Sequence, residues 1–85
     1  MITQPKRILV IDDDRQNCDL LEAMLKMLGH ESEIAMDGFE ALGKLSLDID
    51  LVLLDVMMPG MDGFEVARQI RSNPQYCDLP IIIAT

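Results

Sequence analysis

The sequence predicts an α/β domain built on a doubly wound parallel sheet, with the element order βαβαβαβ. Apolar runs at residues 7–11, 51–55 and 79–85 are short and continuous, which is typical of strands buried on both faces of a parallel sheet. A further strand, the second along the chain, is expected at residues 31–36. The intervening segments have helical periodicity and lengths that suit right-handed crossover helices. These observations favour a single small domain over residues 1–85.

The first helix is expected over residues 15–28, because its apolar residues fall on one arc of a helical wheel. That arc is about 180° wide, whereas a surface helix usually needs little more than about 100°. The helix is therefore expected to need cover on one flank as well as from the sheet. Gly29 is the expected C-terminal glycine. The arc consists of Cys18, Leu20, Leu21, Met24, Leu25, Met27 and Leu28.

The following strand, residues 31–36, alternates only weakly in hydropathy. Its Glu31 and Glu33 suit a strand at the edge of the sheet.

A repeated pentapeptide, Met-Asp-Gly-Phe-Glu, opens the second and third helices at residues 36–40 and 61–65. Its aspartate can accept hydrogen bonds from free backbone N–H groups, and Glu40 occupies the capping-box position. We interpret both copies as strand-to-helix entries, because only the second follows an apolar strand that ends in an acid. The third helix is expected to end by Asn73-Pro74. The residues expected to face inward are Ala41, Leu42 and Leu45 in the second helix and Phe64, Val66, Ala67 and Ile70 in the third.

Acidic residues are expected to meet at the carboxyl edge of the sheet. Asp55 ends the central strand, Asp12 and Asp13 follow the first strand, and Thr85 ends the fourth. A buried Asp55 would require a partner, and each close pair of carboxylates costs roughly 4 kcal/mol at an effective dielectric of about 20. A hard divalent cation removes that cost, and Mg²⁺ suits a site with few carboxylates.

A simpler explanation is that Asp12, Asp13 and Asp14 only cap the first helix. We accept it for Asp14, but it leaves the expected burial of Asp55 unexplained.

The composition restricts the classes of function. The 85 residues carry a formal net charge of -8, which argues against direct binding to nucleic acid or to an anionic membrane. No apolar stretch approaches the roughly 20 residues of a membrane span, and no secretory signal is recognisable. Cys18 and Cys77 match no zinc or disulfide pattern, so a reducing, cytoplasmic location is expected.

Three segments together resemble the receiver domain of two-component response regulators, a flavodoxin-like fold. They lie at residues 8–14, 53–63 and 79–85, and the resemblance covers nearly the whole chain. It implies a signalling phosphoacceptor rather than an enzyme. The implied partner is a histidine kinase or a phosphotransfer protein.

The resemblance also implies a role for each site residue. Asp55 would accept the phosphoryl group. Asp13 would bind Mg²⁺ directly, Asp12 would bind it directly or through water, and the backbone carbonyl of Met57 would be a further ligand. Thr85 would be the switch hydroxyl that turns toward the phosphoryl group.

The family pattern continues beyond these residues with a fourth helix, a fifth strand and a fifth helix. A lysine that pairs with the phosphoryl oxygens and an aromatic switch residue belong to that part. Lys6, Lys26 and Lys44 are not at the matching position. We therefore expect residues 1–85 to form an incomplete receiver with impaired phosphorylation chemistry.

Two alternatives to a phosphoacceptor fail on the sequence, and a third stays open. A calcium loop starting at Asp12 fails at Asn17 and Ala23, where glycine and glutamate are required. A phosphatase with an aspartate nucleophile would want a second acid where Met57 stands. The remaining alternative is a receiver scaffold that acts as an interaction or assembly module without efficient phosphotransfer.

Assembly is expected in either case. The apolar fourth strand would lie at an open sheet edge, and the flank of the first helix with Leu20 and Met27 would lack cover. A homodimer is the expected result.

Overall fold

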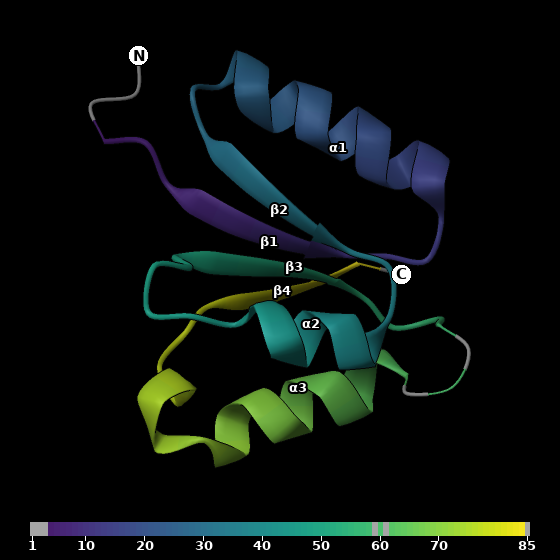
Figure 1. Cartoon of the computed structure of the whole chain (residues 1–85), viewed down its shortest axis with the longest axis vertical. Helices are drawn as coiled ribbons and strands as arrows, with labels where there is room; N and C mark the ends of the chain where they lie inside the picture. Colours follow the sequence, from purple (N-terminus) through teal and green to yellow (C-terminus); the bar gives the residue numbers. More distant parts are fainter. Residues whose placement is uncertain (1–3, 59, 61, 85) are drawn as a thin grey trace.

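A computed structural model describes residues 4–58, 60 and 62–84 of the chain. Its centre is a four-stranded parallel sheet in the order β2-β1-β3-β4. Helix α1 covers one face of this sheet, and α2 and α3 cover the other (Figure 1). The predicted doubly wound α/β fold is confirmed. Its elements are β1 (Arg7–Ile11), α1 (Arg15–Met27), β2 (Glu31–Ala35), α2 (Gly38–Lys44), β3 (Leu51–Asp55), α3 (Gly63–Ser72), a 3-10 turn (Pro74–Tyr76) and β4 (Ile81–Ala84).

The core is divided between the two faces of the sheet. The larger part lies under α2 and α3, and the smaller part lies under α1. Each large aliphatic side chain buried there contributes roughly 1.5–3 kcal/mol. The larger part includes Leu9, Ile11, Val52, Leu54, Val66 and Ile70, and the smaller part contains Ile8, Val10, Cys18 and Leu25.

The central strand β3 is less buried than we predicted. Val52 and Leu54 are buried against α2 and α3, whereas Leu51 and Leu53 on the α1 face are only half-buried. The cause is the unequal cover of the sheet, because one helix protects the second face where two protect the first. The expectation of a strand buried on both faces was therefore wrong for the α1 side.

Helix α1 confirms the expected lack of cover on its flank. Cys18 and Leu25 are buried, but Met27 is 86% exposed. The helix ends at Met27, one residue earlier than predicted, and Gly29 follows with a φ of 88°. Such a positive φ favours glycine. The other exposed members of the predicted arc are Leu20, Met24 and Leu28.

Each α-helix begins at an aspartate cap at the carboxyl edge of the sheet. The carboxylate of Asp37 accepts a hydrogen bond from the N–H of Glu40 at 2.7 Å, and Asp62 accepts one from the N–H of Glu65 at 2.9 Å. The repeated pentapeptide thus serves as two helix entries. In the first copy the Glu40 carboxylate binds the N–H of Met36, one residue before the cap that a capping box would use.

Three further details differ from the prediction. Phe64 is 65% exposed, because it lies two positions before the buried Val66 and this spacing places the two side chains about 200° apart around the helix. Strand β2 ends at Ala35, one residue early, and β4 begins at Ile81, two residues later than predicted. Strand β4 forms an edge of the sheet, as expected.

Within the described ranges, no helix combines the length and the apolar character needed to cross a bilayer.

Candidate metal centre

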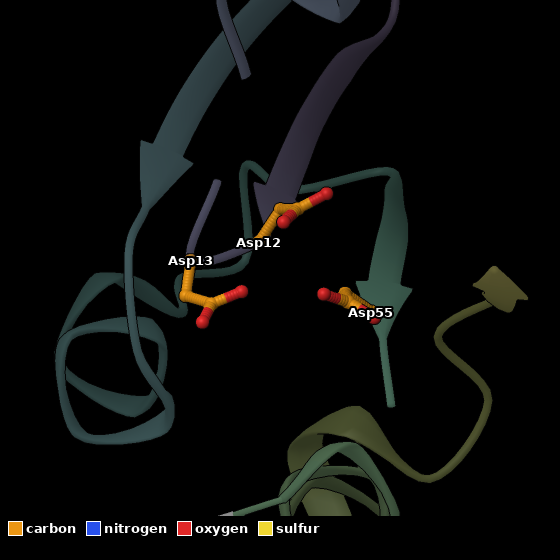
Figure 2. A group of neighbouring side chains, drawn as sticks. All are labelled: Asp12, Asp13 and Asp55. Atoms are coloured by element: carbon orange, nitrogen blue, oxygen red, sulfur yellow. The ribbon is translucent and has the colours of Figure 1, made fainter. Parts of the chain in front are cut away.

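Three carboxylates converge at the carboxyl edge of the sheet. Asp12, Asp13 and Asp55 each offer one oxygen, and these oxygens lie within 4.8 Å of one another (Figure 2). Asp12 and Asp13 directly follow β1, and Asp55 is the last residue of β3. Because β1 pairs in parallel with β3, these two strand ends meet at the same edge. Thr85, the remaining residue predicted for this edge, lies outside the described residues.

Asp12 is the buried member of this acid cluster, with 8% of its surface exposed. Its Oδ1 accepts a hydrogen bond from the N–H of Asp14 at 2.9 Å, and its Oδ2 accepts one from Nδ2 of Asn17 at 3.4 Å. Burial raises the pKa of the Asp12 carboxyl, and the negative charge of Asp55 adds to the rise. The hydrogen bonds from Asp14 and Asn17 only partly oppose this rise in pKa.

Asp55 is half-buried, so the expectation of a buried Asp55 was wrong. Its side chain extends from the end of β3 toward Asp12 and Asp13 (Figure 2). Asp13 is exposed. Asp12 is therefore the buried acid that requires a partner, and its ionised form is the one most disfavoured by the neighbouring carboxylates.

The loop after β3 holds the Asp55 carboxylate in place. Its Oδ1 accepts a hydrogen bond from the N–H of Met57 at 3.0 Å. The Met57 side chain is 77% exposed, whereas Met58 is buried in the core and anchors the loop. Helix α3 then starts close under the strand end, where the N–H of Gly63 donates to the carbonyl of Val56 at 3.3 Å.

Within the described part of the chain, no lysine or arginine forms an ion pair with the acid cluster. Lys6 and Lys44 line a hollow at the amino edge of the sheet, and Lys26 lies in the last turn of α1. Arg15, at the start of α1, pairs with Asp19 at 3.2 Å. Among the described residues, no cationic side chain therefore neutralises the negative charge of the cluster.

The donor set fits a hard divalent cation. All its ligand atoms are carboxylate oxygens, which are the ligands that Mg²⁺ and Ca²⁺ prefer. A cation between Asp12, Asp13 and Asp55 would relieve the repulsion that raises the pKa of Asp12. The structure therefore brings together the acids that the sequence predicted and gives them chemistry suited to a metal.

Two contacts of Asp12 were missed by reasoning from the sequence. One is the amide of Asn17, and the other is the Cys18 thiol, whose Sγ lies 3.3 Å from the backbone carbonyl oxygen of Asp12. The available clue was the place of Asn17 in the first turn of the helix that follows Asp12 and Asp13.

The amino edge of the sheet has a hollow of about 370 Å³ lined mostly by charged residues. Three of these charges satisfy one another, because Arg7 pairs with Glu31 at 3.0 Å and with Glu33 at 2.7 Å. This hollow offers no convergent group for chemistry.

Comparison with known proteins gives a consistent result. The family model described as the response regulator receiver domain matches residues 8–85. The response regulator MprA of Mycolicibacterium vanbaalenii is 50% identical over 82 residues, which are 95% of this chain and 35% of that protein. The chain thus spans about a third of the length of this curated relative.

Two solved structures share the fold. One is the N-terminal domain of a response regulator receiver protein from Methanoculleus marisnigri JR1, with a TM-score of 0.89 and 39% identity over 93% of this chain and 65% of that one. The other is a chain in the complex of the histidine kinase ThkA with the response regulator protein TrrA. It has a TM-score of 0.83 and 46% identity over 92% of this chain and 66% of that one.

Proposed function

The chain belongs to the response regulator receiver domain family, and on this premise we propose that Asp55 accepts a phosphoryl group from a phosphohistidine. The donor would be a histidine kinase or a phosphotransfer protein, and the complex of ThkA with TrrA supports a partner of this kind. The observation that carries the proposal is the acid cluster, in which the half-buried Asp55 ends strand β3.

We propose Mg²⁺ as the cofactor of this site. Asp13 and Asp55 would bind it directly, Asp12 directly or through water, and the backbone carbonyl of Met57 would complete the protein ligands. The crowding of three carboxylates within 4.8 Å supports this assignment. When bound, Mg²⁺ supplies positive charge that screens the incoming phosphoryl oxygens from the acids.

Asp55 is the nucleophile in this proposal. The N–H of Met57 binds one oxygen of the carboxylate, which restrains the group and leaves the other oxygen to attack phosphorus. A new P–O bond forms as the P–N bond to the donor histidine breaks, and its electron pair returns to the imidazole nitrogen. The product is an acyl phosphate on Asp55.

Two expectations concern residues that complete a receiver. Thr85 would supply the switch hydroxyl that responds to the acyl phosphate. The lysine that the resemblance places after Thr85 is not among these 85 residues. One missing electrostatic contact to a transition state costs about 3 kcal/mol at comparable sites. We therefore propose that a polypeptide of residues 1–85 is phosphorylated slowly.

A small acyl phosphate provides the direct test of the phosphoacceptor. Incubation with acetyl phosphate and Mg²⁺ should add one phosphoryl group, and tandem mass spectrometry should locate it on Asp55. The variant Asp55→Asn should gain none, while Asp62→Asn, which alters the cap of α3, should still be modified. Modification at another residue, or none at long incubation with Mg²⁺ bound, would contradict the proposal.

A second candidate is an assembly module that needs no phosphotransfer. It is supported by the exposed apolar side chains on the α1 flank and on β4, which is paired on one side only. We propose that a second copy of the chain covers this surface, because the same patch on two copies can close as a twofold dimer. The module would act in the cytoplasm without contacting nucleic acid.

A further inference from the structure

We propose that Asn17 is a positioning residue that orients the Asp12 carboxylate for the metal, an inference that rests on the proposed function. Asn17 is the third residue of α1, and its amide Nδ2 lies 3.4 Å from Oδ2 of Asp12. It donates a hydrogen bond without adding charge. The acid cluster therefore gains a donor and no further carboxylate.

The third residue of α1 differs in charge from the third residue of the other two α-helices. All three begin at an aspartate cap on the same sheet edge, at Asp14, Asp37 and Asp62. The third helical residue is Glu40 in α2 and Glu65 in α3, the acid expected near a helix N-terminus. Helix α1 has no acid in its first turn. It is also the helix that directly follows Asp12 and Asp13.

The absence of an acid at residue 17, the third residue of α1, has a physical reason. A glutamate or aspartate at residue 17 would place a fourth carboxylate against the buried oxygen of Asp12. The pair would repel strongly, because Asp12 has little solvent to screen its charge. An asparagine supplies the opposite interaction, because its amide nitrogen can only donate to the carboxylate.

The surrounding hydrogen bonds fix which oxygens of Asp12 are held. Oδ1 is held by the N–H of Asp14, and Oδ2 by Asn17. In addition, the buried Cys18 thiol contacts the backbone carbonyl of Asp12. Because both carboxylate oxygens of Asp12 accept hydrogen bonds, rotation of the carboxylate is limited. A metal would therefore bind a ligand that is already oriented.

Metal-free protein gives the first test, with Gln16 as the matched position. The variants Asn17→Asp and Gln16→Asp add the same charge within the first turn of α1, where the helix N-terminus favours an acid. Only Asn17→Asp faces Asp12. In metal-free buffer near neutral pH it should melt at a lower temperature than Gln16→Asp. Equal melting temperatures would overturn the proposal.

Mg²⁺ titration followed by amide NMR gives the second test. Asn17→Ala should weaken Mg²⁺ binding about three- to tenfold. Removing a residue that hydrogen-bonds a metal ligand typically costs about 10- to 100-fold in metal affinity, and we expect a smaller loss here because the hydrogen bond from Asn17 is long. Gln16→Ala should bind like the wild type, and Asn17→Gln, which keeps the amide, should recover most of the affinity. If both alanine variants bind equally well, Asn17 does not orient Asp12.

The two experiments separate this inference from the proposed function. If Mg²⁺ shifts no amide signal even in the wild type, the proposed metal site fails. The comparison of Asn17→Asp with Gln16→Asp in metal-free buffer then still decides whether the side chain of residue 17 lies against the Asp12 carboxylate. If Mg²⁺ binds but the variants at residues 16 and 17 behave alike in both tests, only the positioning role fails.

Discussion

Gly63 packs directly against the end of β3: a Cβ atom added to it would lie 2.5 Å from the backbone carbonyl oxygen of Asp55. This close approach lets α3 begin immediately under the strand that carries Asp55. The position of the Asp55 carboxylate and the start of α3 are therefore coupled through a residue that has no side chain.

We expect Gly63→Ala to destabilise the protein and to disturb Asp55. Overpacking of this kind costs about 1–3 kcal/mol, and here the obstructing atoms are backbone, which cannot rotate away. Gly43→Ala is the matched control, since nothing lies within 4 Å of its added Cβ and alanine is favoured in a helix interior by roughly 0.5–1 kcal/mol. Urea unfolding should rank Gly43→Ala at or above the wild type and Gly63→Ala below it. Equal loss in both would contradict the role assigned to the contact.

The strand ends were predictable from the sequence because they depend on local pattern. The runs that end at Ile11 and Asp55 are continuous and apolar, and parallel strands end at a common edge. The degree of burial was not predictable in this way. Asp12 is buried and Asp55 only half-buried, and that difference depends on which helices cover each strand end.

The contacts of Asn17 and Cys18 with Asp12 could not be predicted from the sequence for a similar reason. Their side chains are placed by the entry angle of α1, which depends on the packing of Cys18 and Leu25 against the sheet. Periodicity identifies that apolar face but does not fix atoms to within a hydrogen bond. The exposure of Phe64 was predictable, since the spacing from Val66 already places the two on different sides of α3.

We expect Asp13→Asn to weaken Mg²⁺ binding by about tenfold or more, because it removes a charge that would lie in direct contact with the cation. Asp14→Asn is the control. It lies next in the chain, and asparagine keeps the cap on the N–H of Gln16 that Asp14 now supplies. Titration followed by amide NMR should show a large loss only for Asp13→Asn. Unchanged affinity in that variant would remove Asp13 from the ligand set.

The pH dependence of stability should reflect Asp12. Burial raises its pKa above the ordinary value of 3.8, so the folded state binds a proton more tightly than the unfolded state does. The stabilisation from that proton is complete below the unfolded pKa and is lost as the pH rises through the raised pKa.

Metal-free protein should therefore lose free energy of unfolding as the pH rises from about 4 through the raised pKa of Asp12. In Asp12→Asn the side chain at residue 12 is uncharged at every pH. This variant should therefore lose less free energy of unfolding as the pH rises, and it should be the more stable protein near neutral pH. Denaturant unfolding at a series of pH values measures both curves. Parallel curves for the two proteins would show that Asp12 is not the group responsible.

The last prediction concerns the uncovered apolar surface. Ile82 of β4 pairs in register with Leu53, so it lies on the α1 face of the sheet, where it is 54% exposed. If a second copy covers this face, Ile82→Lys should shift the chain to monomer, because a buried lysine without a partner is strongly disfavoured. Leu47→Lys, at a side chain exposed in the loop before β3, should leave the assembly state unchanged. Sedimentation at micromolar concentration compares the three proteins directly. A wild type that sediments as a folded monomer would rule out the proposed dimer.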